Sequence, residues 1–255
     1  MSRLHHGTKD FWLGALRVDG PAFRAAAAEA PLDAPVPSCP GWAVQDLVHH
    51  VGVIYRWVGS HAGRGITNRP DPRPRSFEGL PTGAAALAWW DEQYAHLIEL
   101  LDALDPELPA WNWAPQTKKA VFWHRRMAHE TSVHRWDAQM ALGHAEPIEA
   151  KLAADGVTEV LDTWLPAGRG RGPRDRRGVV HLVATDAEQE WYMRLRDVGV
   201  ALLDTDTILD TDDHHTRTMA VGTASDLVLA MFGRVLFEVL DVTGDPTLLE
   251  CLRTG

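Results

Sequence analysis

The stretch HRRMAHETSVHRWDAQ, His124 to Gln139, decides most of what the sequence predicts about fold and function. It gathers three histidines, a glutamate and an aspartate in a segment of helical character. Residues four apart lie on one face of an α-helix, whereas residues five apart diverge by about 140°. Glu130 and His134 therefore converge, but His129 and His134 do not. The segment also lacks the H-E-x-x-H spacing of zinc proteases.

The helix face that carries Glu130 and His134 is expected to point into the protein. It also carries Trp123, Met127, Asp137, Ala138 and Ala141. A carboxylate buried there needs a partner. One interpretation pairs Glu130 with an arginine and makes His134 a core histidine. The other interpretation is a metal site, which requires a third ligand from another helix.

The stretch CPGWAVQDLVHHVGVIYRW, Cys39 to Trp57, supplies a candidate for that third ligand. After a Pro-Gly turn, it predicts a helix with an apolar stripe formed by Leu47, Val51, Ile54 and Val58. His50 lies in this stripe, and His49 is rotated away from it. His50 is therefore the stronger candidate, although a histidine on an apolar face can also be purely structural.

Together, His50, Glu130 and His134 make a His-Glu-His set that leaves coordination positions open for water or substrate, as in catalytic metal sites. Zn²⁺ is the expected ion, and the same ligands could hold Fe²⁺, Ni²⁺ or Co²⁺. Asp137 shares the helix face of His134, so it could orient that histidine from behind. The alternative for Asp137 is a salt bridge with an arginine such as Arg135 or Arg56.

The first half of the chain reads as helices separated by proline and glycine. These helices are expected near residues 8–30, 43–63, 82–104 and 117–143. The stretch LPAGRGRGPRDRRG, Leu165 to Gly178, then has little to bury and predicts a solvated connector. We therefore expect a helical domain over residues 1–165 and a smaller α+β domain over residues 166–255.

The second domain is predicted to contain a small antiparallel sheet, because the apolar period changes from helical to alternating. The strand candidates are GVVHLVAT, EWYMRLR, GVALLDTD and RTMAVGTA. The stretch SDLVLAMFGRVLFEVL then predicts a helix with Ser225 or Asp226 as its N-cap, and DPTLLECLRTG a short terminal helix. TDDHHTR, Thr211 to Arg217, holds ligand-type residues in a turn, which we expect to be a turn rather than a second metal site.

Composition excludes several classes of protein. A formal net charge of -10 and a pI near 5.7 argue against a nucleic-acid partner. No apolar run is long enough to span a bilayer and no signal-peptide pattern opens the chain, so we expect a cytoplasmic protein that does not act in a membrane. Cys39 and Cys251 are expected to be reduced thiols. No long apolar seam suggests self-association, which favours a monomer.

Three stretches of the sequence resemble the mycothiol-dependent maleylpyruvate isomerase family. The resemblance rests on VPSCPGWAVQDLVHHVG and RRMAHETSVHRWDAQ, and on ASDLVLAMFGRVLFEVLDVTGDPTLL near the C-terminus. It implies a DinB-like four-helix bundle followed by a sterol-carrier-like α+β domain. It also implies that His50, Glu130 and His134 are the metal ligands, and that Arg234 in the C-terminal "GR" segment takes part in catalysis.

The resemblance further implies mycothiol and a small electrophilic molecule as partners. A coordinated thiol is deprotonated, so the mycothiol thiolate would add to the cis double bond of the substrate and leave after rotation to the trans form. Arg234 would hold a substrate carboxylate. Alternatives from the same site are mycothiol S-transfer in detoxification or biosynthesis, a purely structural metal, and a non-catalytic protein that binds a lipid or other small molecule.

Overall fold

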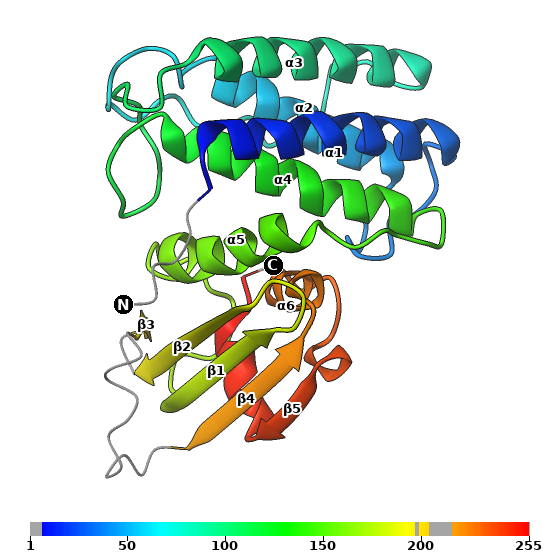
Figure 1. The fold of residues 1–255 in the computed structure, drawn as a ribbon. Coiled ribbons are helices and arrows are strands. Elements are labelled where there is room, and N and C mark those ends of the chain that lie inside the picture. The colour runs from blue at the N-terminus through cyan, green and yellow to red at the C-terminus, as the bar shows by residue number, and fades with distance from the viewer. Residues whose placement is uncertain (1–6, 197–198, 204–215, 255) are drawn as a thin grey trace. The chain divides into compact units, whose positions relative to one another are not determined.

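The computed structural model describes residues 7–196, 199–203 and 216–254, which form two compact units. The first, the helical unit, contains Gly7–Trp113 and Thr117–Glu146. The second, the mixed unit, contains Ala114–Gln116 and the described residues from Pro147 onward. Figure 1 shows helices in the first and a sheet with helices in the second, so the predicted α+β class is confirmed.

The helical unit is a bundle of four long helices. These are α1 (Lys9–Glu29), α2 (Val44–Gly59), α3 (Ala84–Ala103) and α4 (Val121–Met140). They match the four helices expected from the sequence. The main packing pairs are α1 with α4 and α2 with α3, and α2 also packs against α4 (Figure 1). This last contact matters most for function because the candidate ligands lie on α2 and α4.

Local sequence signals set where α2 begins. Gly41 adopts a φ of 85°, a conformation that glycine tolerates without strain, so the Pro-Gly turn reverses the chain before the helix. The Asp46 carboxylate then accepts a hydrogen bond from the backbone N–H of Ala43 at 2.9 Å, which satisfies one donor at the helix start. The turn and cap fix where His50 falls along the helix.

A buried hydrogen bond fixes α2 against α4 close to the candidate ligands. The Thr131 hydroxyl donates to the carbonyl of Met127 at 2.7 Å, and so accepts from the Tyr55 hydroxyl at 2.5 Å. Tyr55 is 1% exposed and Thr131 fully buried. Because leaving either hydroxyl unpaired in the core would be costly, this contact holds the relative register of the two helices.

The mixed unit contains a five-stranded sheet in the order β3-β2-β1-β4-β5. Its strands are β1 (Gly178–Ala184), β2 (Gln189–Arg196), β3 (Gly199–Leu202), β4 (Arg217–Gly222) and β5 (Asp241–Gly244). Its helices are α5 (Ala150–Glu159), which continues as a π-helical turn over Val160–Trp164, and α6 (Ala224–Met231). Helix α5 packs against α6, and α6 packs on β1. The mixed unit begins at Pro147 and so includes α5, which comes before the Gly/Arg-rich connector. The boundary expected at residue 165 therefore falls inside this unit.

The prediction that the sheet is antiparallel is wrong for one pair of strands. Strands β1 and β4 run parallel, with Val179 opposite Arg217, and the other pairs are antiparallel. Alternation of apolar residues indicates which side chains face the core, but carries no information about the direction of the neighbouring strand. The sheet is consequently mixed.

The helix predicted from residue 225 to residue 240 is also too long. Helix α6 ends at Met231, because Gly233 adopts a φ of 70° and terminates it in the usual left-handed manner. Its N-cap is Thr223, whose side chain accepts from the N–H of Asp226, and not Ser225 or Asp226. A short 3-10 turn (Phe237–Val239), β5 and a 3-10 helix (Pro246–Leu252) follow.

Two of the stretches singled out from the sequence are only partly described in the structure. Most of the TDDHHTR stretch and the end of the third strand candidate lie outside the described residues. Within the described residues, none of the helices combines the length and apolar character needed to cross a membrane.

Candidate metal centre

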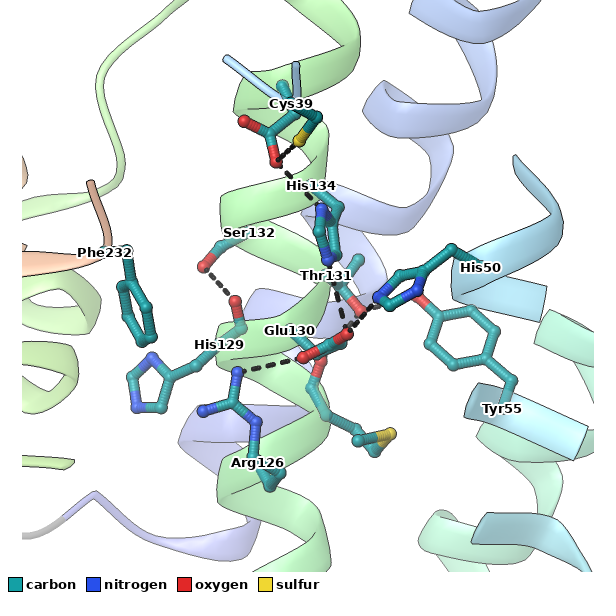
Figure 2. Close-up of polar contacts among 12 residues, drawn as sticks. Cys39, His50, Tyr55, Arg126, His129, Glu130, Thr131, Ser132, His134 and Phe232 are labelled. Atoms are coloured by element: carbon teal, nitrogen blue, oxygen red, sulfur yellow. Dashed lines mark hydrogen bonds and ion pairs between the residues drawn. The ribbon is translucent and has the colours of Figure 1, made fainter. Parts of the chain in front are cut away.

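Three side chains from α2 and α4 converge at one point in the helical unit. His50 Nε2 lies 3.2 Å from Glu130 Oε1, and His134 Nε2 lies 3.3 Å from the same oxygen. Figure 2 shows both imidazole rings pointing at the Glu130 carboxylate. The i and i+4 positions of Glu130 and His134 on α4 produce one half of this arrangement, and packing of α2 against α4 produces the other.

The spacing of these atoms suits a bound divalent ion. Ligand bonds of about 2.0–2.1 Å in tetrahedral geometry place neighbouring ligand atoms roughly 3.3–3.4 Å apart. Both histidine-to-carboxylate separations are close to that value, and all three candidate ligand atoms lie within 4.8 Å of one another. Two imidazole nitrogens and one carboxylate oxygen are also ligands that Zn²⁺ accepts.

Glu130 is ionised in this setting. Burial alone would raise its pKa, but hydrogen bonds from His134 and His50 and the nearby positive charge of Arg126 outweigh burial and hold the pKa well below the usual value. Arg126 Nη2 lies 3.2 Å from Glu130 Oε2, the oxygen turned away from the closest histidine contacts. The arginine pairing and the histidine cluster, treated as alternatives in the sequence, therefore occur together.

His134 is held from behind by Asp137. Its Nδ1 lies 2.8 Å from Asp137 Oδ2, so Nδ1–H donates to the carboxylate and Nε2 is directed at the candidate centre. Burial lowers the pKa of His134, but the hydrogen bonds to Asp137 and Glu130 outweigh burial and raise it. The role suggested for Asp137 as an orienting carboxylate has the geometry it requires.

Asp137 is in turn fixed by the segment that precedes α2. Fully buried, it accepts a hydrogen bond from the Ser38 hydroxyl at 2.6 Å and one from the Cys39 thiol at 3.4 Å. Cys39, Asp137 and His134 also satisfy the distance requirement for a metal group. However, His134 Nδ1 and Asp137 Oδ2 of that group are already hydrogen-bonded to each other. We therefore assign Ser38 and Cys39 to the support of His134.

Among the described residues, no carboxylate supports His50 in this way. Its Nδ1 lies 3.5 Å from a guanidinium nitrogen of Arg73, and its ring packs 4.8 Å from that of Trp42. Burial lowers the pKa of His50, and the hydrogen bond that His50 donates to Glu130 acts against this shift. The neutral form that results is the form that binds metal ions.

The remaining histidines of the two segments have other partners. His49 Nε2 lies 2.7 Å from the carbonyl of Pro81, outside the cluster, although His49 is buried and not turned to solvent. His124 contacts the carbonyls of Leu101 and Ala120. His129 is buried but does not join the cluster formed by the candidate ligands.

Models of known protein families match almost the whole chain. The mycothiol maleylpyruvate isomerase N-terminal domain matches residues 13–139, and the C-terminal domain of the same family matches residues 151–250. The chain belongs to the mycothiol-dependent maleylpyruvate isomerase family. The two matches fall in the helical unit and the mixed unit respectively.

Solved structures confirm the fold of this family member. The crystal structure of the mycothiol-dependent maleylpyruvate isomerase is 15% identical, with a TM-score of 0.61 over 95% of this chain and 96% of that chain. A histidine-to-alanine mutant of that enzyme gives the same TM-score and coverage at 14% identity. No curated protein sequence matches the chain.

Arg234, the catalytic residue suggested by the resemblance, lies in the mixed unit just after α6. Its Nη1 donates to the carbonyl of Phe232 at 2.9 Å. The candidate ligands lie in the helical unit. Sequence reasoning missed two cations beside the ligands, Arg126 and Arg73. The first could have been found from its i–4 spacing to Glu130, whereas the second lies in a loop with no periodic signal.

Proposed function

We propose that this protein is a metal-dependent isomerase that uses mycothiol to convert an electrophilic cis double bond to the trans form. The observation that carries the proposal is the convergence of His50 Nε2 and His134 Nε2 on one oxygen of Glu130, at 3.2 and 3.3 Å. Membership of the family supports the reaction class. The reaction consumes no thiol, because mycothiol is released unchanged after each turnover.

The three ligands would hold Zn²⁺, which keeps a coordinated thiol deprotonated and hence nucleophilic. Glu130 contributes the negative charge of the set, and the hydrogen bonds from His134 and His50, together with the charge of Arg126, keep its pKa low. Asp137 fixes the direction of His134, and Ser38 and Cys39 fix Asp137. The four-coordinate preference of Zn²⁺ leaves one position beyond the three protein ligands, and the thiol would occupy it.

Arg234 remains our candidate for a catalytic residue in the mixed unit. The proposal for it rests on its position in the C-terminal "GR" segment that the chain shares with the family. Arginine suits recognition of a substrate carboxylate because its planar guanidinium donates two parallel hydrogen bonds.

Metal removal provides the direct test of this function. Zinc-loaded protein with mycothiol is expected to isomerise maleylpyruvate, and dialysis against a chelator should abolish turnover while the far-ultraviolet circular dichroism stays largely unchanged. The fold should survive because the bundle has its own apolar core, unlike small domains that fold only around a metal. Re-addition of Zn²⁺ should restore activity.

The outcomes of this experiment separate the competing functions. Turnover that persists in protein shown to contain no metal would contradict the proposal. Loss of helical signal together with the metal would indicate a structural ion. Stoichiometric consumption of mycothiol, with a thioether product, would indicate S-transfer, and retention of a small molecule without any turnover would indicate a binding protein.

A further inference from the structure

A stiff loop of the helical unit extends to the candidate metal centre. The stretch RPDPRPR, Arg69 to Arg75, has a proline at every second position. Proline fixes its own φ near −65° and restricts the residue before it to extended backbone. Arg73 lies between two of these prolines, so its backbone has little freedom. The loop is therefore suited to present the Arg73 side chain at a defined place.

Helix α2 anchors this loop two residues before Arg73. The Trp57 indole N–H donates to the carbonyl of Asp71 at 2.9 Å. Trp57 follows His50 on the same helix by seven residues, about two turns, so both lie on one side of α2. The helix that provides a candidate ligand thus also holds the loop that carries Arg73.

The charge of Arg73 is available at the site. Its guanidinium Nη1 lies 3.5 Å from His50 Nδ1, and within the described part of the chain no carboxylate pairs with it. Glu130, the nearest acidic ligand, already has Arg126 at 3.2 Å. Arg73 therefore approaches the outer side of a candidate ligand without neutralising the carboxylate of the triad.

The two candidate histidine ligands differ in what lies behind them. A neutral imidazole that binds a metal through Nε2 carries its proton on Nδ1 and needs an acceptor there. His134 finds that acceptor in Asp137 at 2.8 Å. His50 faces Arg73 instead, which can only donate. In the structure Arg73 Nη1 donates to His50 Nδ1 at 3.5 Å. Once Nε2 binds a metal and the ring proton is on Nδ1, that hydrogen bond is lost and two N–H donors face each other, so an acceptor from outside the described residues is required.

We propose that Arg73 and the Nδ1–H of His50 form a subsite for a carboxylate of the electrophilic substrate. A carboxylate supplies several acceptor lone pairs, so one group can accept from the guanidinium and the imidazole together. This inference rests on the proposed function, since the proton on Nδ1 follows from metal binding through Nε2. It makes Arg73 a specificity-determining residue that selects acidic substrates.

The test compares two variants of the same loop, Arg73→Gln and Arg75→Gln. Each removes one positive charge, but Arg75 is exposed and has no contact with the ligands in the structure. Maleate, a small cis-dicarboxylate, is titrated calorimetrically into the zinc-loaded wild type and into both variants. Arg73→Gln should weaken maleate binding roughly 10-fold or more, the scale of one hydrogen bond to a charged group, whereas Arg75→Gln should change it less than about two-fold.

A neutral ligand and the metal content complete the design. The diamide of maleate should bind wild type and Arg73→Gln equally. Equal loss of maleate affinity in both variants, or no loss in Arg73→Gln, would overturn the subsite. If the wild type takes up metal normally, failure of the Arg73 subsite does not contradict the proposed function. Conversely, Arg73-dependent maleate binding by a protein that takes up no metal would support anion recognition and contradict the proposed function.

Discussion

Replacement of His50 by alanine is expected to abolish stoichiometric metal binding and isomerase activity while leaving most of the helical signal intact. Loss of an outer supporting residue costs roughly 10- to 100-fold in metal affinity, and removal of one of three protein ligands should cost more. The fold should persist because the His50 side chain is partly exposed and the buried apolar core of the bundle is formed by other residues. Metal analysis of purified protein and circular dichroism measure the two effects.

The neighbouring histidine provides a matched control. His49 is 3% exposed and contacts the carbonyl of Pro81, outside the ligand cluster. His49→Ala should retain the metal, although loss of a buried hydrogen-bonding group is expected to cost about 1–3 kcal/mol of stability. Normal metal content in His50→Ala would contradict the assignment of His50 as a ligand. Loss of the metal in His49→Ala alone would indicate that His49 is the ligand instead.

Replacement of Glu130 by glutamine is expected to be similarly severe for the metal. The amide keeps the size of the side chain but removes the one negative charge of the ligand set, and two neutral imidazoles hold a divalent ion poorly without it. Metal content and turnover should both fall to background. Retention of a full metal equivalent by Glu130→Gln would contradict the assignment of Glu130 as a ligand.

The same substitution tests the electrostatics of the metal-free protein. Because the folded-state pKa of Glu130 is lowered, its ionised form stabilises the fold above the unfolded-state pKa of about 4.3. That contribution should be lost as the pH falls from there through the folded-state pKa. Chemical denaturation should therefore find metal-free wild type more stable than metal-free Glu130→Gln at pH 7, with a difference that shrinks below about pH 4.3. A stability difference that does not change with pH would exclude the ionised Glu130 carboxylate as its source.

The helical unit was largely predictable because its signals are local. The angle between residues of a helix places Glu130 and His134 together without any tertiary information. The apolar stripe of the second helix favours His50 over His49 as a candidate ligand, and His50 is the one that lies in the candidate cluster. Strand positions followed from alternation for the same reason, since the period of two is visible in a few residues.

What the sequence did not predict depends on contacts between distant segments. Arg73 reaches His50 from a loop that has no helical or strand period. The hydrogen bonds of Ser38 and Cys39 to Asp137 span about a hundred positions. The parallel pairing of β1 with β4 and the early end of α6 at Gly233 likewise depend on chain direction and a backbone angle, which residue patterns alone do not specify.

The most direct test of the central claim is made on protein purified without a histidine tag and substituted with Co²⁺. Metal analysis should give one ion per chain, and addition of mycothiol should produce a thiolate-to-metal absorption band, because we propose that the thiol binds at the open position of a site formed by His50, Glu130 and His134. Protein that takes up no metal even after supplementation, or a Co²⁺ spectrum that mycothiol leaves unchanged, would contradict it.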